Sequence, residues 1–175
     1  MKLSVFDWLG VKSGGEEAGS DSETLRRISR SLEAMDPARA RYLACFAFIL
    51  SRVANADLNI SPEETAEMQR QVAAWGKLPE EQAVLVVEIA KGQNRLFGGT
   101  ENFSITKLFK EIAGEGEREA LIHCLFAVSA ADDSISVTEE NEIWKIATEL
   151  GITHSELVAI RSQYRDKREV LRRLQ

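Results

Sequence analysis

Two related stretches decide the fold: Ala56-Asp57-Leu58-Asn59-Ile60-Ser61-Pro62-Glu63-Glu64 and, 75 residues later, Ala131-Asp132-Asp133-Ser134-Ile135-Ser136-Val137-Thr138-Glu139. Aligned without a gap, residues 42–86 and 117–161 agree at ten of 45 positions, and eight of the ten lie between Leu50 and Glu67. An acidic turn that recurs at the same position in two similar segments predicts a domain built from two pseudo-symmetric halves.

Each acidic turn leads into the start signal of a helix. The Ser/Thr-x-x-Glu spacing of a capping box occurs at Ser61/Glu64, Ser136/Glu139 and Thr153/Glu156. Asp36 before Pro37 is a further N-cap, and Gly76, Gly114 and Gly151 are expected to end helices. No segment alternates polar and apolar residues over a useful length, so we expect an all-α fold.

The expected helices follow these signals along the chain. They run from Ser20 or Ser22 to about Ala34, from Pro37 to about Asn55, from Ser61 to Gly76, from Pro79 onward, from Ser104 to Gly114, through the apolar run 121–128, from Ser136 to Gly151, and from Thr153 onward. Residues 92–103, with three glycines, are interpreted as the connection between the halves. Trp75 and Leu150 hold equivalent repeat positions and are expected in the core, whereas Trp144 is expected to be partly exposed.

Composition narrows the class of protein. A chain of 175 residues that is 44% hydrophobic can bury a substantial core in one domain. The net charge of −6 argues against nucleic-acid binding, which needs a basic surface. Cys45 and Cys124 lie in apolar runs and are interpreted as buried thiols in a reducing compartment. No apolar run is long enough to span a membrane and no signal peptide is evident, so a cytoplasmic location is expected.

The two ends of the chain differ from its middle. Residues 1–20 combine a short apolar patch with a Gly/Ser/Glu stretch and are interpreted as a flexible arm, which leaves residues 21–175 as the helical domain. The basic residues between Arg161 and Arg173 have two interpretations: a solvated helix end, or a docking stripe for acidic protein or lipid headgroups.

Carboxylate and hydroxyl oxygens in the turns suit hard divalent cations. Each turn places a Glu seven positions after an Asp, which gives Asp57 with Glu64 and Asp132 with Glu139. Asp133 adds a carboxylate in the second turn only. The earlier ligands of an EF-hand loop are missing, so neither turn is a standard EF-hand.

A structural interpretation of the same residues stays open. The capping boxes explain both Ser-x-x-Glu pairs, at about 1 kcal/mol each. They do not explain Asp57 and Asp132, which follow the ends of apolar helices, where a negative charge opposes the helix dipole. Cation sites and plain turn-and-cap structure are therefore both consistent with the sequence.

At these residues the chain resembles the TerB-like family, a bacterial helical domain of tellurite resistance and stress response. A related domain stands at the N-terminus of a membrane-anchored DnaJ-type co-chaperone. The family's pattern, Ala-Asp-Gly-x-Ile-Ser-x-x-Glu after an apolar helix, is matched from Ala56 to Glu64 and from Ala131 to Glu139. The Gly of the pattern is replaced by Leu58 and Asp133, and the resemblance covers about residues 35–165.

The resemblance implies a single bundle of about seven or eight helices that binds a divalent metal. The oxygen donors of the turns lead us to expect Ca²⁺ or Mg²⁺ rather than Zn²⁺. The residues carried over as ligands are Asp57 and Glu64 in the first half and Asp132 and Glu139 in the second. Asp133, which has no acidic counterpart at Leu58, is a further candidate added to the second turn. The resemblance further implies a non-catalytic adaptor in tellurite and metal stress responses, peripheral to the inner membrane beside an integral-membrane partner. Carboxylates repel tellurite, itself an oxyanion, so any protection is expected to be indirect.

A second function class remains: a helical protein-interaction module whose turns are purely structural. An enzyme is not expected, because no nucleophile elbow, phosphate loop or HExxH motif occurs. His123 and His154 lack a second His or Cys at ligand spacing and are interpreted as structural.

Overall fold

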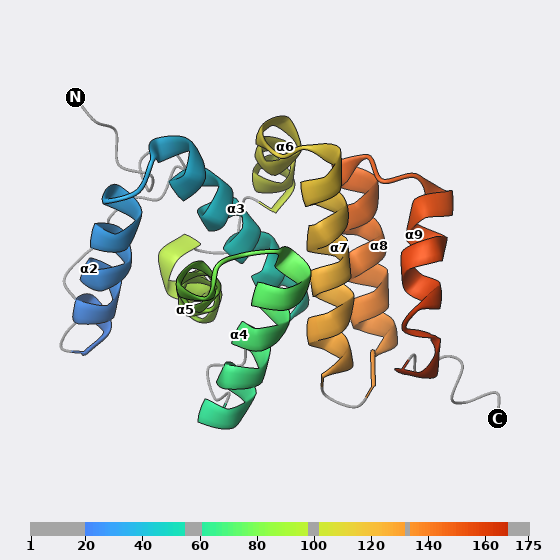
Figure 1. The fold of residues 1–175 in the computed structure, drawn as a ribbon, viewed down its shortest axis with the longest axis horizontal. Helices are drawn as coiled ribbons and strands as arrows, with labels where there is room; N and C mark the ends of the chain where they lie inside the picture. Colours follow the sequence, from blue (N-terminus) through green and yellow to red (C-terminus); the bar gives the residue numbers. More distant parts are fainter. Residues whose placement is uncertain (1–19, 55–60, 98–101, 132–133, 168–175) are drawn as a thin grey trace.

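The computed structural model describes residues 20–54, 61–97, 102–131 and 134–167, arranged as in Figure 1. The described residues form eight α-helices and one 3₁₀ turn: α2 (Ser20–Glu33), α3 (Pro37–Val53), α4 (Pro62–Gly76), α5 (Glu80–Phe97), α6 (Asn102–Ile112), α7 (Glu115–Ala130), α8 (Val137–Leu150), α9 (His154–Ser162) and η1 (Arg165–Lys167). The predicted all-α bundle is confirmed. The arm predicted at residues 1–20 lies outside the described residues, except for Ser20.

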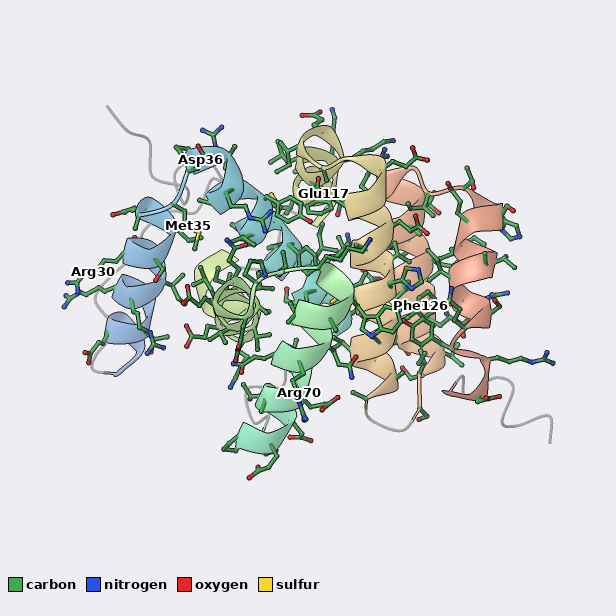
Figure 2. The ribbon with its side chains drawn as sticks, in the orientation of Figure 1. Arg30, Met35, Asp36, Arg70, Glu117 and Phe126 are labelled. Carbon is green, nitrogen blue, oxygen red and sulfur yellow. The ribbon has the colours of Figure 1, made fainter. Side chains whose placement is uncertain are left out.

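The predicted helix starts are formed by side-chain caps. Asp36, labelled at the start of α3 in Figure 2, accepts hydrogen bonds from the backbone N–H groups of Ala38 and Arg39 at 3.0 and 3.2 Å. Complete capping boxes open α4, α8 and α9. These bonds satisfy N–H groups that have no partner within the helix. Because each bond joins residues close in sequence, the helix starts could be predicted from the sequence.

Helix α3 lies at the centre of the bundle. Every residue from Tyr42 to Ser51 is buried, and the helix packs against α2, α5, α6, α7 and α8. The rings of Tyr42 and Phe46 both contact Phe109 of α6, with centroids 5.2 and 6.2 Å apart. A helix that is apolar on nearly all sides is stable only where neighbours cover all of it.

The two halves interlock across the repeat. Helices α3 and α7 precede the two acidic turns, and α4 and α8 follow them. Helix α4 packs against α7 of the other half, as Figure 1 shows, and α8 packs against α3 as well as α7. Each half therefore supplies part of the apolar surface that covers the other, so the halves form one core.

Two expected boundaries were wrong. Helix α5 continues through Gly92 to Phe97, and α6 begins at Asn102, so Ser104 is inside the helix rather than its cap. A helical glycine costs only about 1 kcal/mol. The buried residues of α5, among them Val86 and Ile89, pack against α3 and α4 and outweigh that cost.

The equivalent glycines at the ends of α4 and α8 have different roles. Gly151 adopts the expected left-handed conformation, with φ of 75°. In α4 that conformation falls instead on Lys77, with φ of 53°. Gly76 is the last helical residue, and a Cβ there would lie 3.0 Å from Cζ of Phe46. The constraint at Gly76 is thus the close approach of Phe46 of α3 rather than a left-handed backbone angle.

The expectation for Trp75 was also wrong. Its repeat equivalent Leu150 is fully buried, but Trp75 is 39% exposed. It lies at the rim of the α4–α7 contact, where its ring stacks on His123 with centroids 5.5 Å apart. Trp144 is half-buried, as expected. Among the described helices, none is long and apolar enough to cross a membrane.

Candidate cation-binding turns

Only two of the five residues predicted to bind a cation lie within the described residues. Asp57, Asp132 and Asp133 lie outside the described residues, whereas Glu64 and Glu139 occupy the third positions of α4 and α8. The first turns of both helices point to the lower edge of the molecule in Figure 1. Both glutamates belong to capping boxes.

In the first box, Glu64 is exposed and bonded to Ser61. Its Oε2 accepts a hydrogen bond from the Ser61 backbone N–H at 2.7 Å, while the Glu64 N–H donates to Ser61 Oγ at 3.2 Å. Hydrogen bonding to the backbone and then the side chain of Ser61 lowers the pKa of the Glu64 carboxyl. Glu64 is therefore ionised at neutral pH, as a cation ligand must be.

The second box has the same geometry with one further bond. Glu139 Oε2 accepts from the Ser136 backbone N–H at 2.8 Å and from its hydroxyl at 2.6 Å, and the Glu139 N–H donates to Ser136 Oγ at 3.1 Å. Just before the cap, Ile135 is fully buried, which anchors the entry to α8 in the core.

These bonds leave each carboxylate with capacity for a cation. All the described bonds of Glu64 and Glu139 use Oε2, and an ionised carboxylate has about four lone-pair sites on two oxygens. Capping and coordination through Oε1 are thus compatible. Within the described ranges, no group of three or more His, Cys, Asp or Glu side chains is placed to hold a metal ion. A site here would need oxygens from the turns themselves.

Arg52, one residue before the end of α3, forms a buried charge network that the sequence interpretation missed. Its side chain is only 6% exposed and forms ion pairs with Glu142 and Glu149 of α8, at 2.7 and 2.8 Å. It also donates to the Thr106 hydroxyl of α6 at 2.8 Å. The signal in the sequence was an arginine within the apolar run that ends α3, because a buried arginine needs carboxylate partners.

The pKa values of this network follow from its contacts. Burial opposes the charged form of Arg52, but the hydrogen bonds and charges of Glu149 and Glu142 outweigh it and raise the guanidinium pKa. Burial likewise opposes ionisation of Glu142, yet Arg52 and then Lys145 lower the pKa of its carboxyl. Arg52 and Glu142 are thus held in their charged forms at neutral pH.

One further buried carboxylate and the two cysteines have clear structural roles. Glu140 is 6% exposed and pairs with Arg161 of α9 at 3.3 Å. Cys45 and Cys124 are fully buried, and burial raises the pKa of each thiol to about 12. They are thus protonated core side chains, as the sequence predicted.

His123 belongs to an aromatic cluster formed with Trp75, Tyr164 and Phe126. Figure 2 labels Phe126, whose ring stacks on Tyr164 at 5.3 Å. The Tyr164 hydroxyl donates to the His123 carbonyl at 3.2 Å, and His123 Nδ1 is buried without a partner in the described structure. Burial, ahead of the opposing charge of Glu119, lowers the pKa of His123. The cluster holds Tyr164, two residues after the end of α9, against α7.

Comparison with known proteins gives one match. Residues 42–162 match the family model described as tellurite resistance protein TerB. Searches of curated proteins and of solved structures give no significant match.

Proposed function

Because the chain belongs to the TerB family of tellurite resistance proteins, we propose that it is a non-catalytic protein that binds divalent cations through its two acidic turns. The supporting observation is that both turns lead into a capping box whose glutamate keeps Oε1 outside its described bonds. The proposed ligands are Asp57 and Glu64 in the first turn, with Asp132, Asp133 and Glu139 in the second. Oxygen donors favour Ca²⁺ or Mg²⁺ over Zn²⁺.

Because its proposed ligands are carboxylates, the protein takes only an indirect part in the response to tellurite and metal stress. Carboxylates attract cations and repel oxyanions, so the protein acts on the stress response as a cation-dependent adaptor for a protein partner. The proposed location is the cytoplasm, peripheral to the inner membrane, beside an integral-membrane partner of the same pathway.

The α9 capping box provides a matched control for the test. Glu156 Oε2 accepts from the Thr153 N–H at 2.7 Å and from its hydroxyl at 2.6 Å, as in the Glu139 box, but no acidic turn precedes it. Titration calorimetry with Ca²⁺, Mg²⁺ and Zn²⁺ should show cation binding that Glu64→Gln and Glu139→Gln weaken and Glu156→Gln does not. Loss of binding in all three variants alike, or no binding by the natural chain, would refute the proposal.

A protein-interaction module with purely structural turns is the second candidate. The observation that favours it is that every described hydrogen bond of Glu64 and Glu139 is a capping bond. In that case Asp57→Ala with Asp132→Ala would alter the free energy of unfolding but not partner capture. If capture instead requires both a cation and these aspartates, the adaptor function is supported.

A further inference from the structure

His123 of α7 places an ionisable ring at the rim of the contact between α4 and α7. Its imidazole stacks on the indole of Trp75, with centroids 5.5 Å apart and ring planes only 11° from parallel. The ring of Tyr164, two residues after α9, contacts both, with its centroid 6.5 Å from that of His123 and 6.2 Å from that of Trp75. Three rings from three parts of the chain therefore meet at this rim.

The symmetry-related contact between α8 and α3 has no ionisable ring at the equivalent positions. The repeat equivalents of His123 and Trp75 are Phe48 and Leu150, and both are fully buried. Protonation therefore cannot change these positions of the α8–α3 contact. At the α4–α7 contact, the same positions depend on the charge of His123.

The buried edge of the His123 ring cannot accommodate a second proton. Nδ1 is buried and has no hydrogen-bond partner in the part of the chain that the structure describes. The nearby phenol of Tyr164, whose pKa burial raises to about 12, is uncharged and donates to the His123 backbone carbonyl rather than to the ring. A neutral imidazole has one N–H group, whereas both nitrogens of the imidazolium ion are donors. Protonation thus leaves a charged N–H group buried without an acceptor, which costs far more than a neutral unpaired group.

The charged groups around His123 do not supply that acceptor. Burial has the largest effect on the pKa of His123 and lowers it below the ordinary 6.5; Glu119 of α7 opposes this effect and Lys77, which follows α4, adds to it. Helices α8 and α9 also pack against α7, but their Glu140 and Arg161 pair with each other at 3.3 Å. The ring is therefore neutral at pH 7 and has no carboxylate bonded to it.

We propose that His123 is a pH-sensitive switch that closes the rim of the α4–α7 contact at neutral pH and opens it in acid. The neutral ring packs on Trp75 and Tyr164. The protonated ring turns toward solvent, where water accepts hydrogen bonds from both of its N–H groups, and the other two rings lose a surface against which they pack. Trp75 is already 39% exposed, so acid enlarges an existing apolar surface without unfolding the bundle. The switch does not depend on the proposed cation sites.

Nuclear magnetic resonance and fluorescence together test the switch. The chain has two histidines, so His123→Phe and His154→Phe assign the imidazole resonances. In the natural chain His123 should titrate below pH 6.5. Over the same pH range the quenching of Trp75 fluorescence by acrylamide should rise, measured as the difference between the natural chain and Trp75→Phe. Circular dichroism at 222 nm should stay unchanged, because the opening is local.

Three variants serve as controls. His123→Phe introduces the residue found at the equivalent position 48 and should abolish the rise in quenching. His123→Asn is polar but not ionisable, so it should abolish the rise as well, and it decides the matter if His123→Phe does not fold. His154→Phe removes the other histidine, whose ring centroid lies 5.1 Å from that of Trp144, and should leave the response of Trp75 unchanged.

Three results would overturn the proposal. If His123 titrates at or above pH 6.5, the stack on Trp75 stabilises the imidazolium ion through a cation–π contact and holds the rim closed in acid. If the rise in quenching survives in the folded His123 variants, another group causes it. If His123 titrates below pH 6.5 with no rise in quenching, protonation does not open the rim.

Discussion

Replacing Arg52 by Ala should be among the most destabilising single substitutions in this chain. The change removes the guanidinium of a side chain that is only 6% exposed, and it leaves the carboxylates of Glu142 and Glu149 without their main partner. Breaking a buried ion pair from one side costs about 3–5 kcal/mol. Since Glu142 and Glu149 remain 23% and 20% exposed and can gain some water, we expect the lower end, about 3 kcal/mol.

Urea denaturation at pH 7, followed by circular dichroism at 222 nm, measures this change. Neutralising the whole network, with Arg52→Met, Glu142→Gln and Glu149→Gln together, should recover much of the lost free energy because no buried charge is then unpaired. A loss below about 1 kcal/mol for Arg52→Ala, or no recovery in the triple variant, would refute the assignment of a buried, mutually dependent network.

The pH dependence of stability offers an independent check on the same network. The pKa of Glu142 is lowered in the folded state, so the stabilisation is present above the ordinary carboxylate pKa of 4.5 and is lost as pH falls through the folded value. In Arg52→Ala this acid-dependent loss should shrink. An unchanged acid profile in the variant would mean that Arg52 does not set the Glu142 pKa.

Three further predictions concern other parts of the bundle. Gly76→Ala should lower the free energy of unfolding by about 1–3 kcal/mol because its Cβ meets Phe46. Lys77→Gly should raise it by up to about 1 kcal/mol because glycine relieves the left-handed backbone at that position. Urea denaturation should therefore give changes of opposite sign for the two variants, and changes of the same sign would contradict the packing argument. His123 has a lowered pKa, so stability should fall as pH drops from 6.5 through the folded value; His123→Asn should flatten this dependence, and an unchanged slope would exclude His123 as its source. Both cysteines should resist a thiol reagent at pH 8 until urea unfolds the chain, and rapid reaction of the native protein would contradict their burial.

Helix starts were predictable because their causes are local. A capping box involves residues three positions apart, so Ser61, Ser136 and Thr153 identified three helices without tertiary information. The same locality explains the wrong cap at Ser104. That residue satisfies the sequence rule, but the helix around it extends back to Asn102.

Properties that depend on neighbours distant in sequence were not predictable. Trp75 and Leu150 occupy equivalent repeat positions, yet only Leu150 is buried, because the helices around them differ. Gly76 and Gly151 match in the alignment, but a Phe46 ring crowds one and a positive φ requires the other. Of the predicted cation ligands, the described structure addresses Glu64 and Glu139 as capping residues, while coordination by them stays a prediction.

The amino-acid sequence alone was enough for the all-α class, the internal repeat and the family resemblance, because periodicity, caps and a repeated motif are written in short segments. Only the tertiary structure decided that the halves interlock, with α4 on α7 and α8 on α3, and that Arg52 meets Glu142 and Glu149 across 90 and 97 residues. The physical reason is range: a capping bond spans one helical turn, whereas the partner of a buried charge is set by how the helices pack.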